Sequence, residues 1–261
     1  MRIGVSSAAF YGRMETEDQA ALIRTLPVDT CEIFLQTPSE YSSDFGALVR
    51  KNLGGMPCAS VHPKGTQFEQ DLFARSPRQT EDSFAMFERV CQAGSALGAA
   101  YYVFHGPFGV HAPLTPERIH CLPERFARMR DTAARYGMEV LWEDVHWCAL
   151  KNPEDIRSML SLVPEMNFVL DVKQTWMAGT TPYAMLETMG SHVRHIHVLD
   201  QRPDGSLCLP GEGGMTDWPR LMRQLRDMGY EGAVILEPYE WQTRDASALQ
   251  KSLDDLRSVA G

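Results

Sequence analysis

Residues 137–172 read GMEVLWEDVHWCALKNPEDIRSMLSLVPEMNFVLDV, and they contain one full unit of the pattern that determines the fold. Apolar runs at 138–143 and 167–172 are typical of buried strands. Between them, residues 152–155 (Asn-Pro-Glu-Asp) combine a capping side chain, a proline and acidic first-turn residues, which together predict the start of a helix. The stretch therefore predicts a strand, a helix and a second strand, the repeating unit of an α/β fold.

Further signals for the ends of helices lie on both sides of this stretch. Thr115-Pro116 and Thr181-Pro182 repeat the helix start, and Pro123 is expected to break or kink the first of these two helices. Glycines suited to a left-handed helix end precede several predicted strands. They are Gly98, Gly137, Gly190 and Gly229.

Eight strand-like runs occur in all, separated by longer amphipathic segments. The predicted strands are 2–6, 30–36, 58–62, 100–105, 138–143, 167–172, 193–199 and 233–237. Such a sequence forms either a closed (β/α)8 barrel or an open doubly wound sheet. The barrel is favoured because its usual length is about 250 residues, and because no glycine-rich nucleotide loop follows the first strand. We therefore expect one (β/α)8 barrel domain over residues 1–261.

The composition restricts the class of partner. The chain has 25 Lys and Arg against 34 Asp and Glu, a formal net charge of −9, which disfavours nucleic acid and membrane surfaces. Its six cysteines are widely spaced without a CxxC pair, as in reduced cytoplasmic proteins. No signal-peptide pattern or membrane-spanning run is found. We expect a cytoplasmic monomer or homodimer that acts on a small molecule.

Ionisable residues stand at the predicted carboxyl ends of six strands, the face that forms the active site in a (β/α)8 barrel. Each would be costly to bury without a partner, and a divalent cation provides one. A single residue of this kind is usually a hydrogen-bonded strand end, but the joint placement in successive units indicates a metal site. The residues are His62, His105, Glu143, Asp171, His197 and Glu237.

Together with their neighbours, these strand ends form motifs through which the sequence resembles the xylose-isomerase-like TIM barrel superfamily. This superfamily includes sugar isomerases, ketose 3-epimerases, inosose dehydratases and the endonuclease IV group. The resemblance covers almost the whole chain. Its most specific motifs are Trp142-Glu143, Leu170-Asp171, His195-Ile196-His197-Val198-Leu199-Asp200, Pro210-Gly211-Glu212-Gly213 and Leu236-Glu237-Pro238.

The resemblance implies one divalent cation, Mn²⁺, Mg²⁺, Co²⁺ or Zn²⁺, with Glu143, Asp171, His197 and Glu237 as its ligands. His197 is preferred to His195 because it is nearer the carboxyl end of its strand, and His195 points the same way one layer deeper. Glu143 and Glu237 are the expected catalytic bases, because they would face a substrate from different sides.

The sequence also departs from these relatives. His62 and His105 match positions that hold another zinc, with Glu143, in the endonuclease group. We favour contacts with substrate hydroxyls or phosphate for both histidines, and a second metal is the alternative. Many epimerases have a histidine where Gln174 stands, and further ligands of a third zinc are missing from residues 207–210.

Other residues near the strand ends are candidates for contact with substrate. Lys173 is expected to polarise a carbonyl or bind an anion, with an exposed ion-paired lysine as the alternative. The predicted substrate-binding residues are His62, His105, Lys173, Gln174 and His146. The aromatic residues expected to pack on a sugar or cover the mouth are Phe10, Trp147, Trp176, Tyr239 and Trp241.

Structural roles are expected for three further acidic residues. Glu32 is predicted to point into the barrel and to form hydrogen bonds without taking part in catalysis. Asp200 and Glu212 are interpreted as residues that organise the loop after strand 193–199.

A cation that binds two adjacent oxygens of a hydroxy-ketone acidifies the intervening C–H, and a carboxylate then removes the proton to form an enediolate. Return of the proton gives epimerisation or isomerisation, and loss of a hydroxyl gives dehydration. We expect a metal-dependent isomerase or epimerase of carbohydrate metabolism that acts on a small sugar, sugar derivative or cyclitol. The alternatives are an inosose-type dehydratase, an apurinic-site endonuclease and a barrel that binds a ligand without catalysis.

Overall fold

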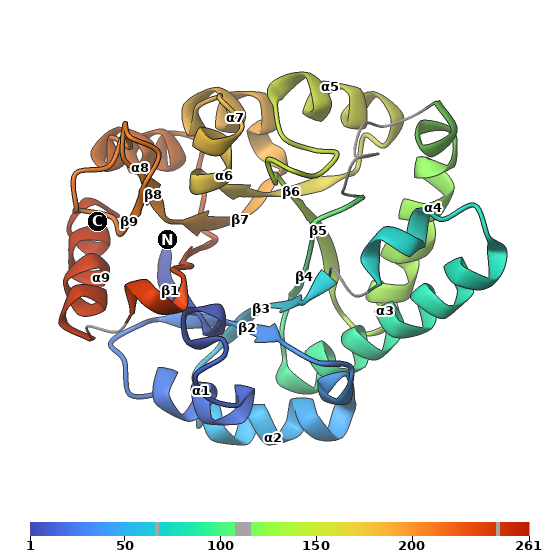
Figure 1. The fold of residues 1–261 in the computed structure, drawn as a ribbon, viewed down its shortest axis with the longest axis horizontal. Helices are drawn as coiled ribbons and strands as arrows, with labels where there is room; N and C mark the ends of the chain where they lie inside the picture. Colours follow the sequence, from blue (N-terminus) through green and yellow to red (C-terminus); the bar gives the residue numbers. More distant parts are fainter. Residues whose placement is uncertain (66–67, 108–115, 244–245, 261) are drawn as a thin grey trace.

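Eight parallel strands close into a barrel in the computed structural model, which describes residues 1–65, 68–107, 116–243 and 246–260. Their order around the barrel is β1-β10-β7-β6-β5-β4-β3-β2, so each strand pairs with its neighbours in the chain and β1 closes on β10. The strands line the centre of the molecule (Figure 1). They are β1 Arg2–Ser6, β2 Thr30–Leu35, β3 Cys58–Pro63, β4 Tyr101–Phe104, β5 Glu139–Glu143, β6 Asn167–Asp171, β7 Val193–Val198 and β10 Ala233–Leu236.

All eight predicted strands are confirmed, and each of their ends lies within one residue of the expected position. The strands of a closed parallel barrel are covered on both faces, so they consist of nearly continuous apolar runs. The four residues of β10, for example, are Ala-Val-Ile-Leu and are all buried. The (β/α)8 barrel class expected from the sequence is therefore correct.

Helices form the outer ring around these strands (Figure 1). Asn152 Oδ1 accepts a hydrogen bond from the Asp155 amide at 3.0 Å, and Thr181 Oγ1 accepts one from the Ala184 amide at 3.2 Å, so both predicted helix starts are confirmed. The α-helices are α1 Thr16–Ile23, α2 Ser43–Leu53, α3 Pro77–Leu97, α4 Pro116–Arg135, α5 Pro153–Leu162, α6 Val172–Met177, α7 Pro182–Met189, α8 Trp218–Asp227 and α9 Ala246–Ala260. The short 3-10 helices are η1 Ser7–Phe10, η2 Pro38–Glu40, η4 Glu69–Phe73, η5 Gly190–His192 and η6 Glu240–Gln242.

Two local predictions need comment. Of the break or kink expected at Pro123, the break does not occur, because α4 continues through this exposed residue, which costs the helix one backbone hydrogen bond without ending it. Thr115, its predicted cap, lies outside the described residues. Gly98 ends α3 in the expected left-handed conformation with φ of +80°, but Gly190 has φ 55° and ψ −134°, so it does not form the left-handed end predicted there.

The barrel interior changes from apolar to polar along its axis. Side chains two residues apart on a strand share a face. Val103, Leu141 and Val169 form one buried interior cluster, and each is followed two residues later by a predicted site residue, which therefore also points inward.

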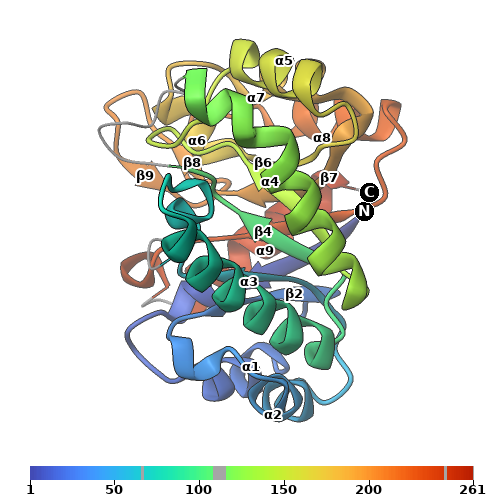
Figure 2. The same cartoon turned by 90° about the vertical axis from the view of Figure 1, so that its right-hand side faces the viewer.

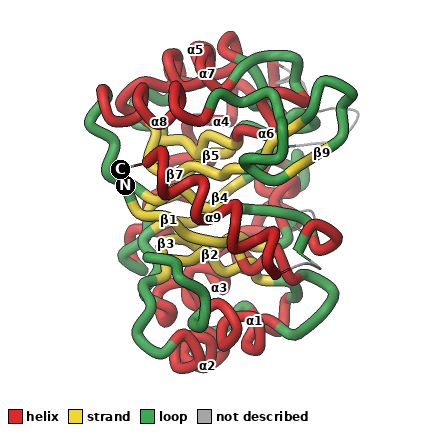
Figure 3. Tube along the Cα trace, turned by 90° about the vertical axis from the view of Figure 1, so that its left-hand side faces the viewer, coloured by secondary structure: helices red, strands yellow, loops and turns green. Residues whose placement is uncertain are grey.

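The polar end of the barrel lies opposite the chain termini. β8 (Asp200–Gln201) and β9 (Leu207–Cys208) form a small antiparallel hairpin after β7. In the two side views the hairpin and the termini lie at opposite ends of the molecule (Figure 2 and Figure 3). The sequence did not reveal this hairpin, because strands of two residues have no measurable periodicity. Across the described residues, no helix combines the length and hydropathy that a membrane span requires.

Candidate metal centre

Four predicted ligands come from consecutive neighbours in the barrel. Glu143 and Asp171 are the last residues of β5 and β6, His197 is the penultimate residue of β7, and Glu237 directly follows β10. The register pairs Asp171 with His197 and His197 with Ile235, which brings all four to one level. Each offers one ligand atom, and these atoms lie within 4.8 Å of one another.

The local backbone explains the position of Asp171. Its Oδ1 accepts a hydrogen bond from the Gln174 amide at 2.9 Å and so caps α6, while its own amide donates to Asp144 Oδ1 at 2.6 Å. The bond from Gln174 engages one carboxylate oxygen, Oδ1. The other, Oδ2, is buried and receives no hydrogen bond from the described residues.

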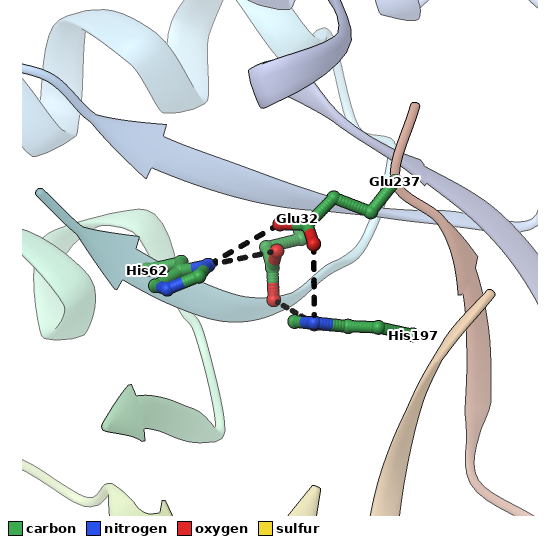
Figure 4. Close-up of side chains that lie close together, drawn as sticks. All are labelled: Glu32, His62, His197 and Glu237. Atoms are coloured by element: carbon green, nitrogen blue, oxygen red, sulfur yellow. Dashed lines mark hydrogen bonds and ion pairs between the residues drawn. The ribbon is translucent and has the colours of Figure 1, made fainter. Parts of the chain in front are cut away.

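His197 lies at the centre of the cluster. Its Nδ1 is 3.1 Å from Glu143 Oε1 and 3.5 Å from Glu237 Oε2, while its Nε2 is 3.0 Å from Glu32 Oε2. Figure 4 shows the Glu32 and Glu237 carboxylates between the rings of His197 and His62. Burial lowers the pKa of His197, but Glu32, Glu237 and Glu143 outweigh it and raise the pKa well above its ordinary value.

Glu32 is a site residue that the sequence indicated only as structural. It is fully buried in β2, pairs in register with Ser60, and belongs to a second group of possible ligands with His62, His197 and Glu237. The available signal was its position as the one charged residue of the apolar run Thr30–Leu35.

His62 and His105 form a third group with Glu143. Their Nε2 atoms are 2.8 Å apart, and His105 Nε2 lies 3.1 Å from Glu143 Oε2. His62 Nδ1 is 3.4 Å from Glu237 Oε1, which links this group to the four predicted ligands. Burial lowers the pKa of His62, but Glu237 and Glu32 raise it to about 10.

Lys173 is buried, so the alternative of an exposed lysine is wrong. Its Nζ lies 3.4 Å from Asp171 Oδ2 and 3.6 Å from Glu237 Oε2, beneath the ring of Tyr239 at 5.0 Å. Burial lowers the pKa of Lys173, but Asp171 and then Glu237 outweigh it and raise the pKa above its ordinary value. The site thus contains one fixed ammonium among its carboxylates.

The other predicted contact residues include one hydrogen-bonded pair. Gln174 Oε1 accepts from the His146 amide at 3.2 Å and lies 2.5 Å from His146 Nδ1, so the two side chains form a pair.

Of the predicted aromatic residues, Phe10 is buried, and Trp176 packs against the core and donates to Thr216. Trp147, Tyr239 and Trp241 are exposed, and the last two rings are parallel within 4°.

Asp200 and Glu212 organise the loop after β7, as expected. Asp200 Oδ1 accepts from the Thr216 hydroxyl at 2.8 Å, and Asp200 Oδ2 accepts from the indole of Trp218 at 3.2 Å. Glu212 Oε2 accepts from the Leu209 amide at 3.1 Å. His195 is buried one layer deeper than His197 and bonds to Ser60, also as expected.

This donor set fits a divalent cation. Three carboxylates and an imidazole converge. The pKa of Asp171 is raised to about 7, because burial and the neighbouring Glu143 and Glu237 outweigh the lowering effect of Lys173. Oxygen and imidazole ligands of this kind suit Mn²⁺, Mg²⁺, Co²⁺ or Zn²⁺. A cation shared by these groups would relieve the repulsion among their negative charges.

Two curated proteins of related activity are similar to this chain in sequence. Fructoselysine 3-epimerase of Escherichia coli O157:H7 is 23% identical over 228 residues, which cover 81% of each chain. Inosose dehydratase of Mesomycoplasma hyopneumoniae (strain 7448) is 24% identical over 213 residues, 69% of this chain and 71% of the relative.

Solved structures share the fold at low identity. D-psicose 3-epimerase from Clostridium cellulolyticum H10, solved with D-tagatose, matches with a TM-score of 0.80 and 18% identity, covering 100% of this chain and 99% of that one. The 3-keto-D-glucoside 4-epimerase from E. coli matches with a TM-score of 0.78 and 18% identity, covering 99% of each chain.

A family model decides the classification, because it matches nearly the whole chain. The match extends over residues 20–259 and includes every predicted ligand. The chain belongs to the xylose isomerase-like TIM barrel family.

Proposed function

We propose that this protein is a divalent-metal-dependent isomerase or epimerase that acts on a small sugar, sugar derivative or cyclitol. One observation carries the proposal: Glu143, Asp171, His197 and Glu237 place their ligand atoms within 4.8 Å of one another at the mouth of the barrel. The relatives named as 3-epimerases and inosose dehydratases support it. The same proposal places the protein in the cytoplasm as a monomer or homodimer with one domain.

The four ligands would hold one cation, Mn²⁺, Mg²⁺, Co²⁺ or Zn²⁺. When bound, it supplies positive charge beside the oxygens of a hydroxy-ketone and so acidifies the intervening C–H. His62 and His105 are proposed to contact substrate, and a second cation between them and Glu143 is the alternative.

Glu143 and Glu237 are proposed to move the proton. One carboxylate takes it from the carbon, and the electron pair passes to the neighbouring carbonyl oxygen. The other glutamate returns a proton to the opposite face, which gives epimerisation. His105 Nε2, 3.1 Å from Glu143 Oε2, and His62 Nδ1, 3.4 Å from Glu237 Oε1, are placed to exchange protons with them.

Residues around the ligands are proposed to bind the substrate. Lys173 directs a buried ammonium toward the cluster, where it can neutralise charge on a substrate oxygen. His146 and Gln174 lie beside it. Tyr239 and Trp241 offer exposed rings against which the apolar face of a sugar can pack.

A dehydratase is the second candidate, favoured by the inosose dehydratase relative. The same carboxylates serve both reactions, and the products differ. A panel of ketoses, aldoses and inososes incubated with Mn²⁺, Mg²⁺ or Co²⁺ distinguishes them, because NMR shows an isomer of equal mass in one case and loss of water in the other.

Glu143→Gln and Glu237→Gln test the assignment of the bases. Each should lower turnover of the accepted substrate by at least about 10²-fold, the usual contribution of a general base. Glu139→Gln, at the opposite end of the same strand as Glu143, is the matched control and should retain activity. Full activity in both site variants would refute the proposed chemistry.

A further inference from the structure

A second polar layer lies beneath the candidate ligands, inside the barrel. It consists of Glu32 on β2, Ser60 on β3 and His195 on β7, and these side chains are fully buried, as is His197. A buried carboxylate is costly unless donors surround it. The hydrogen-bond donors around Glu32 therefore show how this buried layer is stabilised.

The hydrogen bonds of Glu32 determine where its neighbours carry protons. Its Oε2 can only accept, so the Ser60 hydroxyl at 2.7 Å donates to it. The same hydroxyl then accepts from His195 Nε2 at 3.1 Å. His197 Nε2, 3.0 Å from Glu32 Oε2, is likewise a donor.

These bonds leave the other nitrogen of His197 for the ligand cluster. Nδ1 faces Glu143 Oε1 at 3.1 Å and Glu237 Oε2 at 3.5 Å. With one proton held at Nε2, release of the other on cation binding would leave a neutral ring with its lone pair at Nδ1. The opposite tautomer would direct an N–H toward the position that a cation would share with these carboxylates.

We propose that Glu32 is a positioning residue that fixes the tautomer and ring orientation of His197, so that Nδ1 serves as a metal ligand. Ser60 and His195 hold the Glu32 carboxylate in place. The proposal rests on the proposed function, because it requires that the cluster bind a cation. A ligating histidine whose second nitrogen donates to a carboxylate is a general arrangement, and loss of that carboxylate weakens metal binding by roughly 10- to 100-fold.

Calorimetric titration with Mn²⁺ alone tests the proposal. Glu32→Gln keeps the volume and an acceptor but removes the charge, and it should bind Mn²⁺ roughly 10- to 100-fold more weakly than the wild type. The Tm of the metal-free variant should fall, because Glu32 is the buried partner of His62 and His197, so the affinities are compared at a temperature where both proteins are folded. The position of the proton on His197, measured below, separates this role from a merely structural one. The control is Glu40→Gln, a buried glutamate that follows β2 and bonds to Gln36 and Thr16, and its affinity should be unchanged.

The titrations distinguish failure of this proposal from failure of the proposed function. Wild-type protein that fails to bind Mn²⁺ refutes the proposed function and this inference together. Wild-type binding with Glu32→Gln affinity within twofold refutes only the role of Glu32.

A second measurement needs no variant at Glu32 and is therefore independent of how that variant folds. Zn²⁺-loaded wild-type protein labelled with ¹⁵N-histidine is observed by NMR, with His197 identified by comparison with His197→Gln. The expected result is a proton on Nε2 of His197 and a shifted, unprotonated Nδ1. A proton on Nδ1 would overturn the proposal.

Discussion

The acidic residues at the mouth of the barrel differ in charge environment although they lie side by side. Burial raises the pKa of Glu143, but His197 and His105 outweigh it and hold it well below its ordinary value, whereas the pKa of Asp171 is raised to about 7. The imidazoles contact the glutamates, whereas burial raises the pKa of Asp171, with Lys173 opposing the rise and Glu143 and Glu237 adding to it. These differences suit Glu143 to remain an ionised base.

Glu69 gives a residue-scale prediction outside the ligand cluster. It is buried, accepts from the Tyr102 hydroxyl at 3.0 Å, and burial raises its pKa to about 7 although His105 and His62 lower it. Between the pKa of the unfolded chain, about 4.3, and this value, the folded state retains a proton that the unfolded state has lost. The free energy of unfolding therefore decreases as pH rises through this window.

Glu69→Gln removes this dependence. Its unfolding free energy relative to the wild type should be higher at pH 8 than at pH 5, by an amount on the order of 3 kcal/mol. Urea titrations at the two pH values measure the difference. Glu187→Gln, at an exposed position of α7, is the control, and a difference for Glu69→Gln that stays constant with pH would contradict the argument.

The predictability of the site residues depended on their place in the strand. Asp171 and Glu237 stand where an apolar run ends, so their position alone marked them as facing the mouth. Glu32 lies within its strand, and nothing local shows that β7 places His197 at 3.0 Å from it. That contact arises from closure of the barrel, which brings together residues 165 apart in the chain.

At the scale of elements, α5 shows how much a single cap contributes. Asn152 accepts from the Asp155 amide at 3.0 Å, and Pro153 occupies the first turn. Asn152→Ala should lower the unfolding free energy by about 1 kcal/mol, because it leaves this donor without its cap. Denaturant unfolding measures the loss, Asn152→Asp should retain the stability of the wild type, and equal stability of all three proteins would contradict the capping role.

Strand boundaries were predicted well because each strand is a short apolar run between polar turns. The elements that were missed or mistaken lack such a signal. The β8–β9 hairpin has two residues in each strand, and α4 tolerates Pro123 because the rest of the helix continues to pack against the barrel. A local sequence pattern predicts an element correctly where the apolar residues of the pattern are the buried ones. It fails where contacts with distant parts of the chain determine the structure.

At the scale of the whole molecule, the barrel concentrates part of its acidic excess at one end. The formal net charge is −9, and Glu32, Glu143, Asp171 and Glu237 all lie at or beneath the mouth, near the buried Lys173, His62 and His197. Burying this many carboxylates is unfavourable without compensating cations. This arrangement supports the proposed cation site.

Exchange of a substrate C–H proton with D₂O tests this central claim most directly, because it reports proton abstraction whatever the final product. The protein, loaded with Mn²⁺ and then exchanged into Mg²⁺ for NMR, is incubated with each ketose and inosose of the panel. We predict deuterium at the carbon next to the carbonyl of at least one substrate, and loss of this deuterium in whichever of Glu143→Gln and Glu237→Gln lacks the carboxylate that abstracts the proton. Absence of deuterium from every substrate would contradict the account. So would incorporation by both variants that equals incorporation by the wild type.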